Sequence, residues 1–165
     1  MSDLFGNPTV TPKEPIRTLG LWQPFASLML HGKVETRKVR KGKKPPFPNG
    51  KYLLYSTLKA TPEATLHEWC SPEQLDNIKG LLRFEDTRDL CGFALLVAEL
   101  RGVTKMSKHD EAVAFIQYKE HPEHDVWMLV FEDIQRIEPF AWKFGGQGVG
   151  FVPDSERGKI IILDV

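Results

Sequence analysis

The sequence predicts an α+β fold in which short strands alternate with capped helices. The segment 91–101 is rich in valine and leucine, which is typical of a buried strand. The pairs Thr61-Pro62 and Ser71-Pro72 each join a capping hydroxyl to a proline, which indicates a helix start. The 165 residues are 41% hydrophobic and 27% charged, enough for one core. We expect a flexible tail over 1–15 and a single domain over 16–165.

The first helix and its neighbours can be justified residue by residue. Pro24 suits a first helical turn because its missing N–H has no partner there, and Gly32 suits a helix end. Gln74 lies three residues after Ser71, which fits a capping box. The predicted elements, in order, are strand 16–21, helix 24–31, strand 34–40, loop 41–49, strand 51–57, helices 62–69 and 72–82, strand 91–101, helix 108–118, strand or hairpin 125–137 and closing strand 159–165.

Charge and composition narrow the function classes. The formal net charge is zero, so no global field draws the protein toward nucleic acid. The segment 33–51 is nevertheless basic, with Glu35 as its only acid. Such a patch suits phosphate contacts, and a solvated loop is the open alternative. No apolar run approaches the ~20 residues of a membrane span, and no signal-peptide pattern is seen. We therefore expect a cytoplasmic protein without a membrane partner.

Lys33, Glu35 and Arg37 alternate along the predicted strand 34–40. Alternate residues of a strand point to the same side. These three side chains therefore either form a solvated face or line a polar pocket beside the apolar helix 24–31.

The segment from Leu21 to Arg37 resembles the opening signature of the ASCH domain, a small β-barrel family of the PUA-like superfamily. The resemblance is carried by LWQPFASL, then Gly32-Lys33 and Glu35-Thr36-Arg37, and it extends to weaker strand motifs downstream. It implies a barrel of about six mixed strands, with a helix after the first strand and a helical insertion. It also implies that a polar cleft binds RNA or a modified nucleobase or nucleoside, with DNA as an open alternative.

The candidate ligand-binding residues are Trp22, Gln23, Pro24, Glu35, Arg37, Ser56 and Lys143. Trp22 would stack on a base and Gln23 would read a base edge. The alternatives are a core position for Trp22 and a plain strand end for Ser56. Lys143 precedes the glycine-rich segment 144–151, which is a candidate loop over the pocket. The candidate phosphate-binding residues are Lys38, Arg40, Lys43 and Lys44.

Glu99 interrupts the apolar run 91–101, and a buried carboxylate needs a partner. We expect Lys33 and Arg37 to be its partners, with a structural ion pair or a solvated strand end as alternatives. Some small ASCH proteins use lysine, threonine and glutamate as a metal-independent amidohydrolase on acetylated cytidine. The resemblance therefore offers Lys33, Thr36 and Glu99 as a catalytic set, for that reaction or for a ribonuclease.

One departure argues against that activity. Thr36 lies one residue later, relative to Arg37, than the family's threonine, and one residue turns a strand side chain to the other face. Lys33 and Thr36 should then point apart unless a bulge intervenes, and finding both in one pocket would favour an enzyme.

No cofactor and no metal are expected. His121, His124 and Asp125 hint at a metal, but further clustered ligands are lacking in the sequence. A regulatory or host-interaction barrel without a working pocket is a third alternative. The sequence leaves the oligomeric state open.

Overall fold

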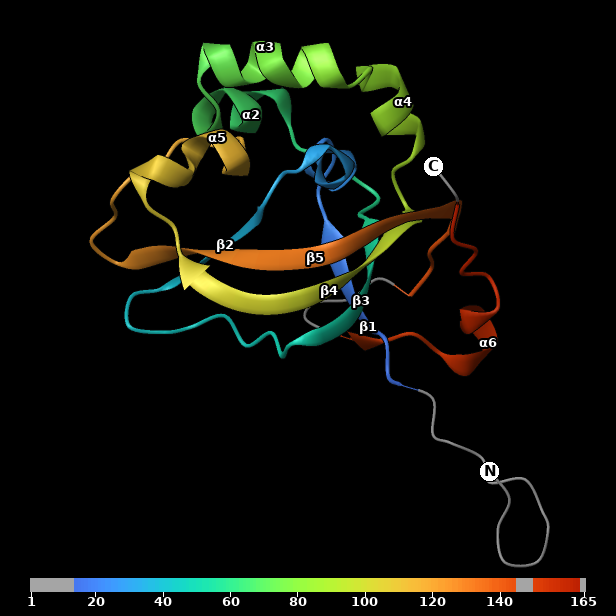
Figure 1. The fold of residues 1–165 in the computed structure, drawn as a ribbon. Helices are drawn as coiled ribbons and strands as arrows, with labels where there is room; N and C mark the ends of the chain where they lie inside the picture. The colour runs from blue at the N-terminus through green and yellow to red at the C-terminus, as the bar shows by residue number, and fades with distance from the viewer. Residues whose placement is uncertain (1–13, 145–149, 164–165) are drawn as a thin grey trace, which may run out of the picture.

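The computed structural model describes residues 14–144 and 150–163, apart from the side chains of 84–86 (Figure 1). The strands are β1 Arg17–Leu21, β2 Glu35–Arg40, β3 Gly50–Ser56, β4 Phe93–Lys105, β5 His124–Ala141 and β6 Gly150–Phe151. The helices are α1 Phe25–Leu28, α2 Glu63–Trp69, α3 Pro72–Leu81, α4 Phe84–Asp89, α5 Glu111–Ala114 and α6 Asp154–Arg157, with short 3-10 turns η1 Met29–His31 and η2 Lys108–Asp110.

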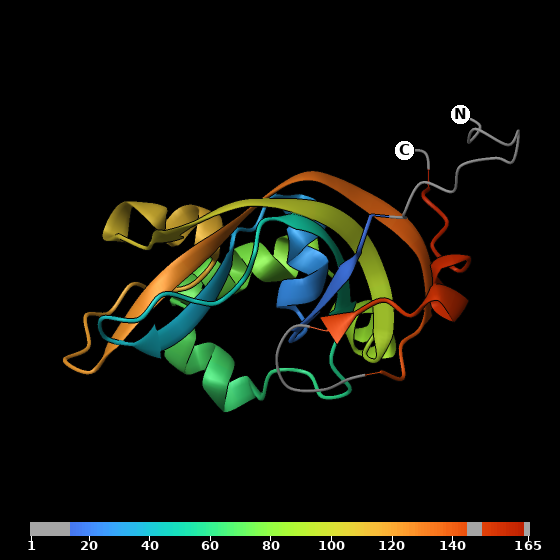
Figure 2. The ribbon, with the colours of Figure 1, turned by 90° about the horizontal axis from the view of Figure 1, so that it is seen from below.

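The strands form one six-stranded sheet in the order β2-β5-β4-β3-β1-β6. β1 and β3 run parallel and the other neighbours run antiparallel, so the sheet is mixed. The sheet curls into a half-barrel around α1, as the view from below shows (Figure 2). The predicted α+β class, with mixed strands and a helix after the first strand, is confirmed.

The helix α1 lies between two apolar clusters. Ala26 of α1 and Met29 of the following turn η1 face the sheet, where they join the core with Leu54 and Leu96. Phe25 and Leu28 face the other way, into a cluster that α2 and α3 complete. The helical insertion therefore covers α1 on the side away from the sheet (Figure 1).

Several local predictions agree with the structure. Gly32 ends the first helical segment with a φ of 87°, a conformation that glycine adopts without strain. Ser71 and Gln74 form the expected capping box at the start of α3. No helix in the described part of the chain is long and apolar enough to cross a membrane.

Two predictions need correction, and one helix was not predicted at all. The helix expected over 108–118 ends at Ala114, because Phe115 adopts a left-handed backbone with a φ of 58°. The helix α4 was not expected. The closing strand expected over 159–165 is wrong for the described residues 159–163. They form no strand, and an isolated bridge joins Ile162 to Ile137. β6 pairs with the first residues of β1 instead, at Arg17 and Thr18.

Candidate functional site

A cavity of about 560 Å³ lies where the curled sheet meets the helical insertion. Six parts of the chain contribute to its wall: the C-terminal end of β1, the helix α1, the strand β2, the C-terminal end of α2, the segment 116–121 and the start of β5. The lining residues are Gly20, Trp22, Phe25, Lys33, Glu35, Thr36, Arg37, Lys38, Glu68, Trp69, Ile116, Gln117, Lys119, Glu120, His121, His124 and Val126.

The cavity reaches the seam between β1 and β2. These two strands are not neighbours in the sheet order, and β2 is an edge strand. A side chain bridges the seam, because Arg37 Nη2 donates a hydrogen bond of 3.0 Å to the carbonyl of Gly20. The half-barrel is therefore joined here by an arginine instead of a strand ladder.

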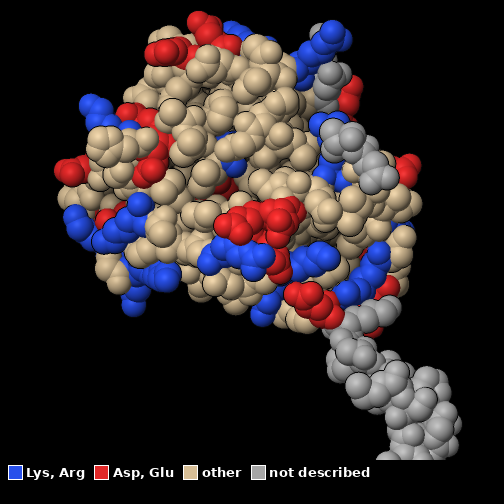
Figure 3. Space-filling view, viewed as in Figure 1, with Lys and Arg blue, Asp and Glu red and all other residues tan. Residues whose placement is uncertain are grey.

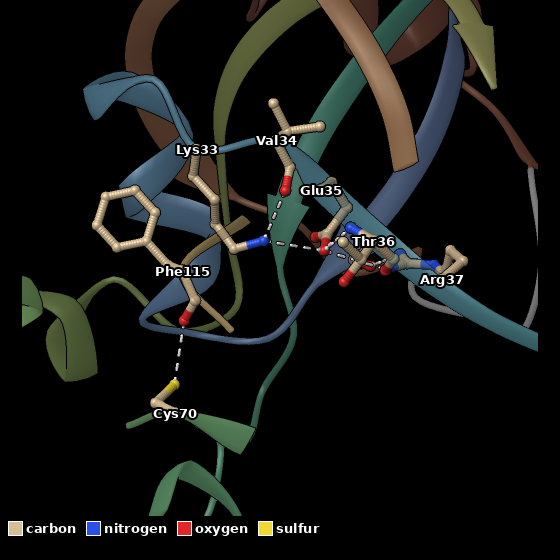
Figure 4. Close-up of polar contacts among 8 residues, drawn as sticks. Lys33, Val34, Glu35, Thr36, Arg37, Cys70 and Phe115 are labelled. Carbon is tan, nitrogen blue, oxygen red and sulfur yellow. Dashed lines mark hydrogen bonds and ion pairs between the residues drawn. The ribbon is translucent and has the colours of Figure 1, made fainter. Parts of the chain in front are cut away.

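Lys33, Glu35 and Arg37 form a buried ion cluster in the cavity wall (Figure 4). Glu35 Oε1 lies 3.4 Å from Lys33 Nζ and 3.6 Å from Arg37 Nη1. The side chains of Lys33 and Glu35 are only 1% and 7% exposed. Glu35 Oε1 also accepts a hydrogen bond from the backbone N–H of Thr36. The predicted alternation of the three residues is thus realised as a pocket wall, and the solvated-face alternative is wrong.

Burial and charge shift both titrating groups of the pair. Burial lowers the pKa of Lys33, and Glu35 opposes that effect only in part. Burial tends to raise the pKa of Glu35, but the charges of Lys33 and Arg37 and the Thr36 N–H outweigh it, so the pKa is lowered. The cluster therefore holds a carboxylate ionised beside an amine that gives up its proton more readily than a free lysine.

Two tryptophans form the aromatic part of the wall. Trp22 is 46% exposed and stacks on Trp69, with ring centroids 6.0 Å apart and an interplanar angle of 24°. Phe25 continues this wall inward, and Lys33 Nζ lies 5.0 Å from its ring centroid. Trp22 is therefore not a core residue, and its candidate role beside a ligand fits its position.

The structure brings together six of the predicted residues in this cavity: Trp22, Lys33, Glu35, Thr36, Arg37 and Lys38. Lys33 and Thr36 were expected to point apart if both followed strand alternation. Lys33, Glu35 and Arg37 keep the predicted alternation. Thr36 and Lys38 line the cavity as well, because β2 is an edge strand and the cavity borders its outer edge. Both residues therefore line the same cavity.

Glu99 does not join the cluster, and its expected pairing with Lys33 and Arg37 is wrong. It lies in the middle of β4, and its carboxylate pairs with Arg101 at 2.9 Å. Its side chain is 28% exposed, so the carboxylate reaches water. β4 is separated from β2 by β5 in the sheet, which keeps the two sites apart.

Gln23, Pro24 and Ser56 do not line the cavity. The buried Gln23 side-chain amide donates to Ser27 Oγ and accepts from the Ser27 N–H, so both its nitrogen and its oxygen are bonded to Ser27 of α1. The buried Ser56 hydroxyl donates to the carbonyl of Leu90. The side chains of Gln23 and Ser56 are thus engaged in hydrogen bonds within the fold and lie outside this cavity wall.

The remaining basic residues lie outside the cavity wall. Arg40, Lys43 and Lys44 are exposed at the end of β2 and in the following loop. Lysines and arginines gather at the corresponding end of the molecule, at the left of Figure 3. Lys143 is exposed and does not line the cavity. Of the predicted loop over the pocket, 144–151, the part 145–149 lies outside the described residues, and Gly150–Phe151 form β6 beside β1.

Sequence reasoning missed part of the wall. Trp69 lies in the insertion, and nothing local in the sequence indicates that it stacks on Trp22. Cys70 follows it, donates to the Phe115 carbonyl, and has a pKa raised to about 11 by burial. His121 and His124 both line the cavity mouth. Among the described residues, no group of three or more His, Cys, Asp or Glu is placed to hold a metal ion.

No family model matches the chain, and no curated protein matches its sequence. Among solved structures, ASCH from Zymomonas mobilis is similar, with 14% identity, a TM-score of 0.47, and coverage of 87% of this chain and 91% of that chain. A serine-to-alanine variant of that protein gives 14% identity and a TM-score of 0.45, covering 87% and 92%. A tyrosine-to-phenylalanine variant of the same protein gives 13% identity and a TM-score of 0.45, with coverage of 87% of this chain and 94% of that chain. The likeness is distant.

Proposed function

We propose that the cavity binds a nucleobase or nucleoside, free or as part of an RNA strand. The observation that carries this proposal is the half-exposed Trp22–Trp69 pair beside the buried ion cluster of Lys33, Glu35 and Arg37. A flat aromatic ligand fits a wall of this kind, because it can stack on the rings while its polar edge meets the charged groups.

The size and chemistry of the cavity support this class of ligand. A volume of about 560 Å³ falls within the range of small-molecule sites. Tryptophan offers stacking area to any base. Glu35 and Arg37 offer an acceptor and donors for its edge. A purely apolar ligand is disfavoured, because it would leave the cluster without polar contacts.

The first test is equilibrium dialysis with cytidine, uridine, adenosine and guanosine. The Trp22→Ala variant should lose about 5- to 150-fold in affinity, the factor that ~1–3 kcal/mol of stacking gives. Trp142→Phe is the matched control, because Trp142 is buried in another cluster. If none of the four binds, or if Trp22→Ala binds as tightly as the wild type, the proposed role of this wall is wrong.

The exposed basic residues extend the proposal to RNA. Arg40, Lys43 and Lys44 lie beyond Lys38, which itself lines the cavity. Changing Arg40, Lys43 and Lys44 to glutamate should weaken the binding of a short single-stranded RNA and flatten its dependence on salt, while nucleoside binding is kept. If the RNA affinity does not change, these residues do not contact RNA and belong to a solvated loop.

A second candidate is a metal-independent hydrolase in the same cavity. It is favoured by Lys33, whose pKa is lowered by burial, next to Glu35 and Thr36. In acetylated cytidine, water would add to the acetyl carbonyl and the C–N bond would break, releasing acetate and cytidine. One of the cluster's groups would take the proton from water, and the departing nitrogen would receive one.

This candidate is tested by following cytidine release from N4-acetylcytidine by chromatography. Thr36→Val should slow turnover if the threonine hydroxyl takes part. Glu99→Gln should leave turnover unchanged, because Glu99 lies outside the cavity. A wild-type protein that binds cytidine and releases no acetate would be a binding protein only.

A further inference from the structure

The outer edge of β2 has a regular pattern of backbone hydrogen bonds. In an antiparallel pair, alternate residues turn both their N–H and C=O toward the partner, and the residues between turn both away. Among the described strands, β2 pairs with β5 alone. Either its even-numbered or its odd-numbered residues must therefore turn their backbone groups away from the sheet.

Hydrogen bonds along the strand identify the even-numbered residues as the outward ones. The Thr36 N–H donates to Glu35 Oε1 at 2.8 Å, and its carbonyl accepts from Arg37 Nη1 at 3.1 Å. The Arg40 carbonyl accepts from the Lys43 N–H at 3.0 Å. On the other side, the Lys41 N–H donates to the carbonyl of Glu123, just before β5.

The even-numbered residue just before the strand also turns its backbone groups outward. The Val34 N–H donates to the carbonyl of Val113, and its own carbonyl accepts from Lys33 Nζ at 3.0 Å. Val34 and Thr36 are therefore fully satisfied within the protein. Lys38 is different, because no partner is found for its backbone N–H or C=O anywhere in the described ranges 14–144 and 150–163.

We propose that the backbone N–H and C=O of Lys38 bind the edge of the base in the cavity. This inference rests on the proposed function. Lys38 lines the cavity, and an extended residue presents its N–H and C=O side by side. Bases carry a donor next to an acceptor on their Watson–Crick edge, so one residue can exchange two hydrogen bonds with one base.

A peptide strand added to β2 fits this edge less well. Strand addition uses the outward groups of several successive alternate residues. Here Val34 and Thr36 are already engaged, and the Arg40 carbonyl is taken by the Lys43 N–H. One free residue between occupied neighbours suits a single planar group.

The test separates the backbone of Lys38 from its side chain. Lys38→Pro removes the outward N–H but no ladder hydrogen bond, as proline on an edge strand allows. Lys38→Ala removes the side chain and keeps the backbone. With the ribonucleoside that binds most tightly among the four, Lys38→Pro should lose about tenfold or more in affinity. Lys38→Ala should lose several-fold less affinity than Lys38→Pro.

A measurement on the wild type keeps the test valid if Lys38→Pro does not fold. Amide hydrogen exchange should be fast at Lys38 and slow at Val39, whose N–H lies in the ladder, and the nucleoside should slow exchange at Lys38. Two results would overturn this inference and leave the proposed function standing: equal affinity of Lys38→Pro and Lys38→Ala, or a bound nucleoside that does not slow hydrogen exchange at Lys38. Absence of nucleoside binding to the wild type would overturn the proposed function as well.

Discussion

Two clusters of charged residues lie on the same sheet and behave differently. In the buried ion cluster, Glu35 is held between Lys33 and Arg37 in the cavity wall. In the exposed ion cluster, Arg101 meets Glu99, Glu132 and Asp133 at 2.9, 3.2 and 3.3 Å over β4 and β5. Arg101 is 51% exposed, whereas Lys33 is 1% exposed.

The comparison shows that the number of ion pairs is a poor guide to their importance. Water screens the exposed ion cluster, so each of its contacts contributes little. The buried pair has lost its water, so each partner depends on the other. The exposed cluster has the shorter distances and the more numerous contacts, yet the buried cluster is the one expected to matter for stability and for ligand binding.

The largest effect is expected from Glu35→Gln, which leaves the Lys33 ammonium buried without its carboxylate. It should lower the free energy of unfolding by about 3–5 kcal/mol, as breaking a buried pair does. Urea denaturation measures this. Glu99→Gln is the matched control in the exposed ion cluster and should stay within about 1 kcal/mol. Equal losses in the two variants would remove the distinction between the clusters.

The second largest effect is expected from Arg37→Ala, which should lower the free energy of unfolding by about 1–3 kcal/mol. The arginine joins β2 to β1 through the Gly20 carbonyl and also contacts Glu35, but its side chain is 29% exposed, which limits the loss. Thermal unfolding with hydrogen exchange across β1 and β2 would check it. If the seam closes by packing alone, the exchange of β1 amides will not change.

The stability contributed by Glu35 should depend on acid pH. Its pKa is lower in the folded protein than the ordinary value of 4.5, so the unfolded chain binds more protons in between. The contribution is therefore complete above about pH 4.5 and is lost as pH falls through the folded pKa. The difference in unfolding free energy between wild type and Glu35→Gln should shrink in that window. A difference that stays constant below pH 4.5 would contradict the lowered pKa.

The smallest effect is expected from Arg101→Ala. The three carboxylates around it are 28%, 59% and 74% exposed, so water can replace the arginine. The loss should be about 0–1 kcal/mol and should fall further in 1 M salt. A loss as large as that of Arg37→Ala would show that the exposed ion cluster is coupled to the packing of β4 and β5.

Local chemistry explains which parts of the fold and the site were predicted correctly. The capping box of Ser71 and Gln74 and the left-handed end at Gly32 depend on neighbours within a few residues. The shared face of Lys33, Glu35 and Arg37 was predicted for the same reason, since they fall within five consecutive residues, but their ion pairing with one another was not predicted. Glu99 was misplaced because its neighbours depend on strand order and on β-bulges between β4 and β5, which local pattern does not contain.

Local sequence was enough for the short-range features: the α+β class, the capped helices, the loop 41–49 and the grouping of Lys33, Glu35 and Arg37. Each depends on hydrogen bonds and steric limits between residues close in the chain. The packing of distant segments placed Trp22 against Trp69 at the surface, engaged Gln23 and Ser56 in internal hydrogen bonds, and left the outward backbone of Lys38 without a partner among the described residues. These outcomes depend on which distant segments curl together, and that is set by the packing of the whole half-barrel.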